Sequence, residues 1–233
     1  MLDTTHMSSI FLSRLETQVT VNNVIQSRTN RNGSSGDYWT LISLLCLAFE
    51  TPNVLMIGLG GGSIISEIKK LNDNIPIEVA EIDKEIIEIY KNYFPVYNDV
   101  IIHNEDGIDF LKQKKSCYNL LILDAYDSDK IPNIFLTDLF IENAYVSLIK
   151  NGIFAINCIN DMKFNGELAK LIEKLKMRFS VNILANSSVT NNIILVCSEK
   201  EVIDAYFSKI LMLLKNNNFD KNIVETYLNF SKA

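Results

Sequence analysis

A glycine-rich turn is the first feature of the sequence that suggests chemistry. Gly58-Leu59-Gly60-Gly61-Gly62-Ser63 directly follows the apolar run Val54–Ile57 and precedes a helical pattern. Glycines permit a tight turn and let a ligand approach the backbone, and the N-terminus of the next helix offers unpaired N–H groups. The spacing differs from the G-x-G-x-x-G of dinucleotide-binding proteins, since the third glycine comes one position early. The turn predicts a ligand site, with tight packing as the alternative.

Carboxylates follow the next two strands of the sequence. A carboxylate at the end of the second strand, about 20 residues after such a turn, can accept hydrogen bonds from both ribose hydroxyls. We assign that role to Glu81, and we assign to Asp83 the N-cap of the helix that begins at Lys84. Asp106 can accept a hydrogen bond from an adenine amine or cap the helix after it, and both interpretations stay open.

An acidic segment, Asp124-Ala125-Tyr126-Asp127, follows the fourth strand. Open α/β sheets bind ligands in the crevice at the C-terminal ends of their strands, so we interpret Asp124 and Asp127 as functional. These carboxylates and the glycine turn predict a nucleoside site. No Walker lysine follows the turn, which disfavours an NTPase. Acidic groups near the reacting centre suit a cation, such as a sulfonium or an amine.

Short apolar runs alternate with helical patterns over most of the chain, which predicts a parallel sheet covered on both faces. The runs are continuous rather than alternating, as expected of strands buried on both faces. The expected strands are Val54–Ile57, Ile77–Ile82, Val100–Ile102, Leu120–Leu123 and Ile153–Ile156. The expected helices are Ile64–Leu71, Lys84–Asn92, Gly107–Lys114, Phe135–Ile149 and Gly166–Arg178.

The C-terminal pattern is different. Val181–Leu184 and Ile193–Val196 flank a polar stretch and predict an antiparallel hairpin that closes one edge of the sheet. Helical segments are expected at about Glu201–Leu214 and Asp220–Asn229. Together these elements predict an α/β domain over residues 51–233 with a mostly parallel, seven-stranded sheet.

The N-terminal part has a weaker pattern. Gln18–Ile25 looks like a strand with a turn at Asn22-Asn23, and the polar segment Arg28–Gly36 looks like a loop. We therefore expect residues 1–50 to form a short β and helical appendage to the main domain.

Composition narrows the function classes. The chain of 233 residues is 48% apolar and 21% charged, which supplies a single core, and its net charge of −6 argues against a general nucleic-acid or anionic-membrane binder. Without a basic region followed by an apolar run, or an apolar stretch of about 20 residues, we expect neither a signal peptide nor a membrane span, and hence a cytoplasmic protein. The four cysteines are scattered, which indicates free thiols rather than a metal site.

Residues 54–160 resemble the spermidine-synthase-like family of adenosyl-sulfonium-dependent transferases, which implies the Rossmann-like class I methyltransferase fold. The likeness covers about half of the chain, and the stretch Asn23–Ser27 adds to it upstream. The matching pieces are Gly58–Gly62, Glu81-Ile82-Asp83, Asp106-Gly107, Asp124–Asp127 with Ile131-Pro132, Leu136-Thr137 and Asn151–Asn157.

The resemblance implies a role for each matching position. Asp124 would orient or deprotonate an attacking amine beside the cofactor, and Asp127 would help to bind that amine. The cofactor would be S-adenosylmethionine or its decarboxylated form, the partner a small-molecule amine or another acceptor, and no metal is implied. The positions implied to bind the cofactor, besides Asp124, are Gln26, Gly58, Gly60, Gly61, Glu81, Ile82, Asp106 and Gly107.

Three departures from the family's pattern weigh on the activity. Aminopropyltransferases carry an aspartate in the glycine turn that holds the amine of decarboxylated S-adenosylmethionine and would repel the carboxylate of the intact cofactor, and here Gly61 stands in that position. Asp37-Tyr38-Trp39-Thr40 replaces the family's Tyr-His-Glu-type segment. The residues before Gly58 are also too few for the family's full N-terminal β-domain.

The departures favour a methyltransferase that uses intact S-adenosylmethionine. The alternatives are a shortened polyamine aminopropyltransferase (spermidine synthase) and a non-catalytic nucleoside-binding protein of the same fold. Relatives of this family pair, and four apolar residues are expected to leave surface that a second copy could cover, so the sequence allows a homodimer. These residues are Phe135, Leu136, Leu139 and Phe140.

Overall fold

The computed structural model describes most of the chain. The described residues are 8–12, 16–21, 24–30, 38–126, 131–159, 166–185, 192–217, 219, 221–229 and 231–232. Asp127 lies outside them, so the structure does not test this predicted site residue. Gln26 lies in a described strand, although only its backbone is described.

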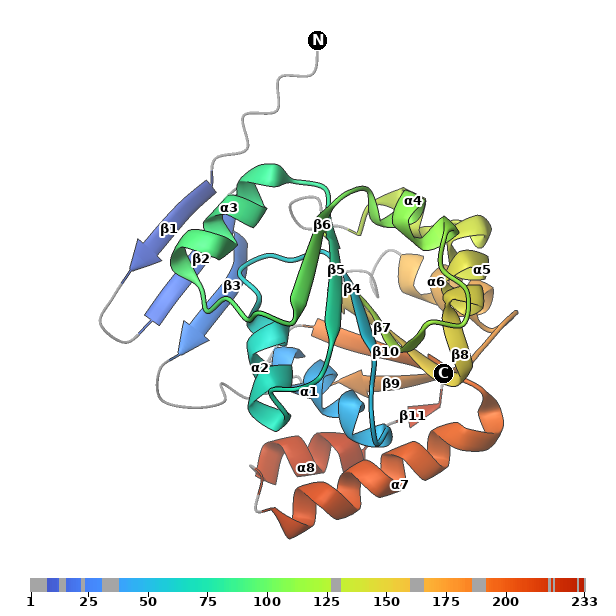
Figure 1. Cartoon of the computed structure of the whole chain (residues 1–233). Helices are drawn as coiled ribbons and strands as arrows, with labels where there is room; N and C mark the ends of the chain where they lie inside the picture. Colours follow the sequence, from blue (N-terminus) through green and yellow to red (C-terminus); the bar gives the residue numbers. More distant parts are fainter. Residues whose placement is uncertain are drawn as a thin grey trace.

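The larger of two described sheets has the order β11-β9-β10-β8-β7-β4-β5-β6 (Figure 1). Its strands are β4 (Val54–Ile57), β5 (Ile77–Glu81), β6 (Val100–Asn104), β7 (Tyr118–Leu123), β8 (Leu148–Ile159), β9 (Ser180–Ala185), β10 (Asn192–Ser198) and β11 (Ser231–Lys232). Strands β8, β7, β4, β5 and β6 pair in parallel, whereas β10 pairs antiparallel with β8 and β9. The predicted mostly parallel, seven-stranded sheet with its C-terminal hairpin is therefore confirmed, and the two-residue β11 adds an eighth strand.

Strand β4 and residues Leu120–Leu123 of β7 are continuously apolar because both faces of the sheet are covered at its centre. Side chains alternate between the faces, so that Met56 and Ile122 enter one apolar core while Leu55 and Leu121 enter the other. All four side chains are almost completely buried. Because β4, β5, β6 and β7 run parallel, their C-terminal ends, with the polar residues there, lie at one edge of the sheet.

Helices cover both faces. The first core is covered by α1 (Tyr38–Ser43), η1 (Leu44–Ala48), α2 (Ser63–Leu71), α3 (Lys84–Tyr93), α7 (Lys200–Asn216) and α8 (Lys221–Leu228). The second is covered by α4 (Gly107–Lys112), η2 (Asn133–Leu136), α5 (Asp138–Ser147) and α6 (Glu167–Leu175). The helix predicted over Phe135–Ile149 is wrong at both ends. Thr137 caps α5 by accepting a hydrogen bond from the Phe140 N–H, and Leu148 already begins β8, since it pairs with Tyr118.

A second, antiparallel sheet precedes α1. It consists of β1 (Ser8–Leu12), β2 (Glu16–Val21) and β3 (Val24–Asn30) in that order. Strands β2 and β3 pair with each other, and the predicted turn at Asn22-Asn23 lies outside the described residues. The predicted loop begins too early, because Arg28–Asn30 continue β3 through ladder pairing with β2, which their polar composition does not reveal. Strand β1 was not expected from the sequence.

Helix α1 and η1 are buried beneath the C-terminal helices. The Tyr227 hydroxyl of α8 donates to the Leu41 carbonyl of α1 at 2.5 Å, and the Lys209 ammonium of α7 donates to the Ala48 carbonyl of η1 at 3.0 Å. These contacts satisfy carbonyl groups that short helices leave without partners. Helices α1 and η1 are thus joined to α8 and α7.

The outer surface carries little of the apolar area that the sequence suggested for a dimer. Phe135 and Phe140 are buried in the second core, whereas Leu139 is 63% exposed. Among the described residues, no helix is both long enough and apolar enough to cross a membrane.

Candidate active site

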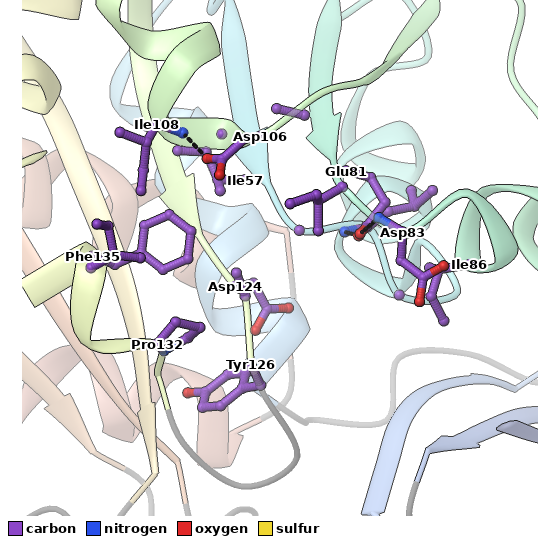
Figure 2. Close-up of a pocket in the computed structure, with 18 residues that line it drawn as sticks. Ile57, Glu81, Asp83, Ile86, Asp106, Ile108, Asp124, Tyr126, Pro132 and Phe135 are labelled. Carbon is purple, nitrogen blue, oxygen red and sulfur yellow. Dashed lines mark hydrogen bonds between the residues drawn. The ribbon is translucent and has the colours of Figure 1, made fainter. Parts of the chain in front are cut away.

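A cavity of about 340 Å³ opens at the C-terminal ends of β4, β5, β6 and β7, where the sequence predicted a ligand site. Figure 2 shows Glu81 and Asp83 on one side, Pro132 and Phe135 on the other, and Asp124 between them. The lining residues are Ile57, Gly58, Leu59, Gly60, Ala80, Glu81, Ile82, Asp83, Ile86, Asp106, Gly107, Ile108, Asp124, Ala125, Tyr126, Pro132, Ile134 and Phe135.

The glycine turn forms the floor of the cavity at the end of β4. Gly58 has a φ of +92°, and a Cβ atom there would lie 2.3 Å from the Asp124 carbonyl oxygen. Gly60 also has a positive φ and lines the cavity, whereas Gly61 is buried and is not among the lining residues. A glycine at 58 is required by the fold itself, because it allows β4 and β7 to end side by side.

Glu81 is held in a fixed orientation at the end of β5. One carboxylate oxygen accepts from the Leu59 N–H and the other from the Asp83 N–H, each at 2.8 Å. The side chain is 9% exposed, and burial raises its pKa while these two hydrogen bonds oppose the rise. The carboxylate therefore links the glycine turn to the end of β5, and it also lines the cavity.

Asp83 and Asp106 both cap helices. Asp83 accepts from the Glu85 N–H at 2.8 Å at the start of α3, as the sequence predicted. Asp106 accepts from the Ile108 N–H at 2.8 Å at the start of α4, the bond drawn in Figure 2. Asp106 also lines the cavity, so its capping and ligand roles are compatible.

Gly107 packs against the end of β4. A Cβ atom at this position would lie 2.5 Å from the Ile57 Cγ2 atom, so a larger side chain would push α4 away from the sheet. The close approach keeps the first turn of α4, and with it Asp106, at the cavity wall.

Asp124 at the end of β7 meets two neutral hydrogen-bond donors. The Asn157 side-chain amide of β8 donates to it at 2.7 Å, and the Tyr38 hydroxyl of α1 lies 3.4 and 3.5 Å from its two oxygens. Burial raises the pKa of Asp124 to about 6, and the two donors oppose the rise. Asp124 is therefore a carboxylate whose charge is only partly compensated, and it gains from a cationic ligand.

The lining of the cavity is acidic, and it also includes exposed aliphatic side chains. Four carboxylates line it, and no basic side chain is among the described residues that do so. Ile82 and Ile134 line it too, although they are 68% and 53% exposed. Exposed aliphatic side chains beside a cavity offer a surface on which a flat aromatic base can pack.

The sequence located most of this site, and the structure adds to it. Seven of the ten predicted site residues line the cavity together, and Gly61 does not. The side chains of Gln26 and Asp127 are outside the described part of the chain. The structure adds two residues that contact Asp124, namely Tyr38 and Asn157. The sequence included Asn157 only in a segment that matches the family and gave it no role. Asn157 could have been noticed as a polar residue in an apolar run, whereas Tyr38 follows a polar stretch and carries no local signal.

The fold and the site together define a Rossmann-like α/β protein with an acidic ligand cavity at its strand ends. Comparison with protein families matches residues 42–205 to the spermine/spermidine synthase domain. This match spans more than half of the chain, and the chain therefore belongs to the spermine/spermidine synthase family, as its resemblance predicted.

Two curated relatives carry the name polyamine aminopropyltransferase. The protein from Clostridium beijerinckii is 34% identical over 107 residues, which are 43% of this chain and 38% of the relative. The protein from Prochlorococcus marinus is 29% identical over 141 residues, which are 57% of this chain and 50% of the relative. The matched part of the chain thus spans half or less of these relatives. Their names favour the aminopropyltransferase alternative over the methyltransferase interpretation.

Solved structures support the fold. A probable spermidine synthase from Corynebacterium glutamicum aligns with a TM-score of 0.72 and 18% identity, over 97% of this chain and 91% of that one. Human methyltransferase-like protein 13 aligns with a TM-score of 0.60 and 18% identity, over 84% of this chain and 90% of that one. The predicted class I methyltransferase fold is confirmed.

Proposed function

We propose that this protein transfers an aminopropyl group from decarboxylated S-adenosylmethionine to an amine, as a polyamine aminopropyltransferase. The observation that carries the proposal is the cavity lined by four carboxylates without a basic side chain among its described residues. Both substrates of this reaction are cations, and the cofactor carries a sulfonium and an amine. A negatively charged, partly desolvated cavity attracts such ligands.

The bound cofactor would supply the activated carbon–sulfur bond. The amine nitrogen of the acceptor attacks the carbon bonded to sulfur, the carbon–sulfur bond breaks, and its electron pair stays on sulfur. The chain's own task is to align the amine and to take its proton. Asp124 would serve for both, and its pKa, which burial raises to about 6, would make it a better proton acceptor than an ordinary carboxylate.

We assign a different part of the cofactor to each of the remaining site residues. Glu81 accepts from the ribose hydroxyls at the oxygen lone pairs that the Leu59 and Asp83 N–H groups leave free. Ile82 would pack against the adenine ring, and Asp106 would accept from the adenine amine beside its bond to the Ile108 N–H. Gly58 and Gly60 pass under the aliphatic part of the cofactor.

Methyl transfer from intact S-adenosylmethionine remains the second candidate, because one observation favours it. Gly61 places no carboxylate in the glycine turn, and the intact cofactor carries a carboxylate that such a group would repel. The absence of basic lining residues in the described part of the cavity speaks for the decarboxylated cofactor. The two candidates therefore differ in the cofactor that they require.

Calorimetric titration with both cofactors separates the candidates. We expect decarboxylated S-adenosylmethionine to bind at least about tenfold more tightly than the intact form, a difference of about 1.4 kcal/mol. Mass spectrometry of reactions with small diamines should then show the acceptor gaining an aminopropyl group. Tighter binding of the intact cofactor, with a gain of a methyl group, would replace the proposal by methyl transfer. Failure of both cofactors to bind would leave the non-catalytic alternative.

A further inference from the structure

The side-chain amide of Asn157 donates one hydrogen bond and accepts another. Asn157 lies in β8, only 1% exposed, and its side-chain nitrogen donates to Asp124 at 2.7 Å. Its side-chain oxygen accepts from the Asn192 side-chain nitrogen, at the first residue of β10, at 2.9 Å. Its backbone carbonyl accepts from the Tyr126 hydroxyl. Both ends of the Asn157 amide are thus used by side chains from neighbouring strands.

The direction of the Asn157 amide decides which form of Asp124 is stabilised. An amide nitrogen that faces a carboxylate stabilises the ionised form, whereas an amide oxygen in its place would repel that form and accept from the protonated one. An isolated asparagine could turn either end toward Asp124. The Asn192 side-chain nitrogen favours one of these orientations, because it donates to the Asn157 oxygen and so leaves the Asn157 nitrogen to face Asp124.

We propose that Asn192 is a positioning residue that, through Asn157, holds Asp124 in its ionised, proton-accepting form. Asn192 does not line the cavity among the described residues, and it acts on Asp124 only through the buried amide. This inference rests on the proposed function in one respect, because the proposed function makes Asp124 the proton acceptor. The effect on the ionisation of Asp124 stands without it.

Other titratable groups around Asp124 are common to all variants compared below. The Tyr38 hydroxyl of α1 lies within hydrogen-bond distance, and Tyr126, two residues along the chain, interacts with its charge. Three further carboxylates share the cavity, namely Glu81, Asp83 and Asp106. Because none of these is altered, a change in the ionisation of Asp124 in Asn192→Ala reports on the asparagine pair, whereas Asn192→Asp also adds a negative charge that raises the pKa of Asp124 directly.

The test compares two changes at Asn192 with a control on the same strand. Asn192→Ala removes the donor, and Asn192→Asp replaces it by an acceptor that draws the Asn157 nitrogen away from Asp124. Ser198→Ala removes another bond between β10 and β8, the one from the Ser198 hydroxyl to the Gly152 carbonyl at 2.8 Å, far from Asp124. This variant reproduces the loss of a strand-to-strand contact and leaves the asparagine pair intact.

The first readout is the pKa of the Asp124 carboxyl in the ligand-free protein, measured by carbon NMR. We expect Asn192→Ala to raise it by about one unit and Asn192→Asp by more, with Ser198→Ala within about 0.2 units of the parent. Equal values in all four proteins, or an equal rise in Ser198→Ala, would overturn the inference.

The second readout is the pH dependence of kcat/KM for aminopropyl transfer. Its acid limb should move upward in the Asn192 variants by the same amount as the NMR value and stay in place in Ser198→Ala. If no transfer occurs in any protein but the carboxyl pKa still moves, the proposed function fails and the positioning role stands. If transfer occurs and the acid limb does not move in the Asn192 variants, the positioning role fails alone.

Discussion

Asp124 and Glu81 are two carboxylates of the same cavity that the protein holds by different means. Glu81 accepts from two backbone N–H groups, which belong to the glycine turn and to the strand end. Asp124 accepts from two side chains, those of Tyr38 and Asn157. The first arrangement fixes geometry through the fold, whereas the second leaves a charge that depends on distant residues. This difference predicts different outcomes when each carboxylate is replaced by its amide.

Asp124→Asn is expected to stabilise the protein while it abolishes transfer. The pKa of Asp124 is about 6 in the folded protein, whereas the ordinary value of 3.8 applies to the unfolded chain. The folded wild-type protein therefore loses stability as pH rises through this interval. The neutral amide escapes that loss, and the half-buried position limits the gain to about 1–2 kcal/mol at pH 8. Thermal unfolding at pH 8 and at pH 4 measures it. A gain that is as large at pH 4 would contradict this explanation.

Glu81→Gln is expected to destabilise the protein and weaken cofactor binding. The amide keeps one acceptor oxygen, and its nitrogen meets the N–H of either Leu59 or Asp83, which costs about 1–3 kcal/mol. Unfolding in urea and calorimetric titration of the cofactor measure the two effects. Asp83→Asn is the control, because asparagine also caps a helix well and should leave stability within about 0.5 kcal/mol of the parent.

At the scale of elements, the packing of β4 against β7 requires glycine at position 58, whether or not a ligand binds there. Gly58→Ala places a Cβ atom 2.3 Å from the Asp124 carbonyl oxygen at a positive φ, so we expect a loss of more than about 2 kcal/mol and a displaced Asp124. Gly166→Ala is the matched control. Gly166 has a φ of +73° with no atom within 4 Å of an added Cβ, so only the backbone cost of about 1 kcal/mol applies. Equal losses in urea unfolding would show that the close approach is unimportant.

The elements also show which parts of the molecule a sequence can reveal. Strand β4 and residues Leu120–Leu123 of β7 were predictable because burial on both faces makes them apolar. Glu81 and Asp124 were predictable because they are carboxylates at the C-terminal ends of strands. Tyr38 lies 86 residues from Asp124, and only the packing of α1 brings the two together. Strand β1 depends on ladder pairing with β2 rather than on its own composition. Contacts between distant segments are what the sequence does not show.

The acidic cavity has a consequence for the whole molecule in solution. The proposed cationic cofactor would be attracted by the carboxylates and by the net charge of −6, and salt would screen this attraction. Raising KCl from about 50 to about 500 mM should weaken the binding of decarboxylated S-adenosylmethionine several-fold, and that of a neutral adenosyl thioether less than about twofold. Calorimetry with both ligands measures this. Equal salt dependence would mean that the carboxylates do not attract the cofactor's charge.

The bond between Tyr227 and the Leu41 carbonyl spans 186 residues and affects the order of folding. Helix α1 bears Tyr38, whose hydroxyl reaches Asp124, and α1 is bonded in turn by a residue of the last helix. During synthesis, the strands that carry the cavity's carboxylates leave the ribosome well before Tyr227 does. We therefore expect the surroundings of Asp124 to be completed late, when α8 packs on α1, so that a nascent chain without α8 holds the strand ends before it holds Tyr38 in place.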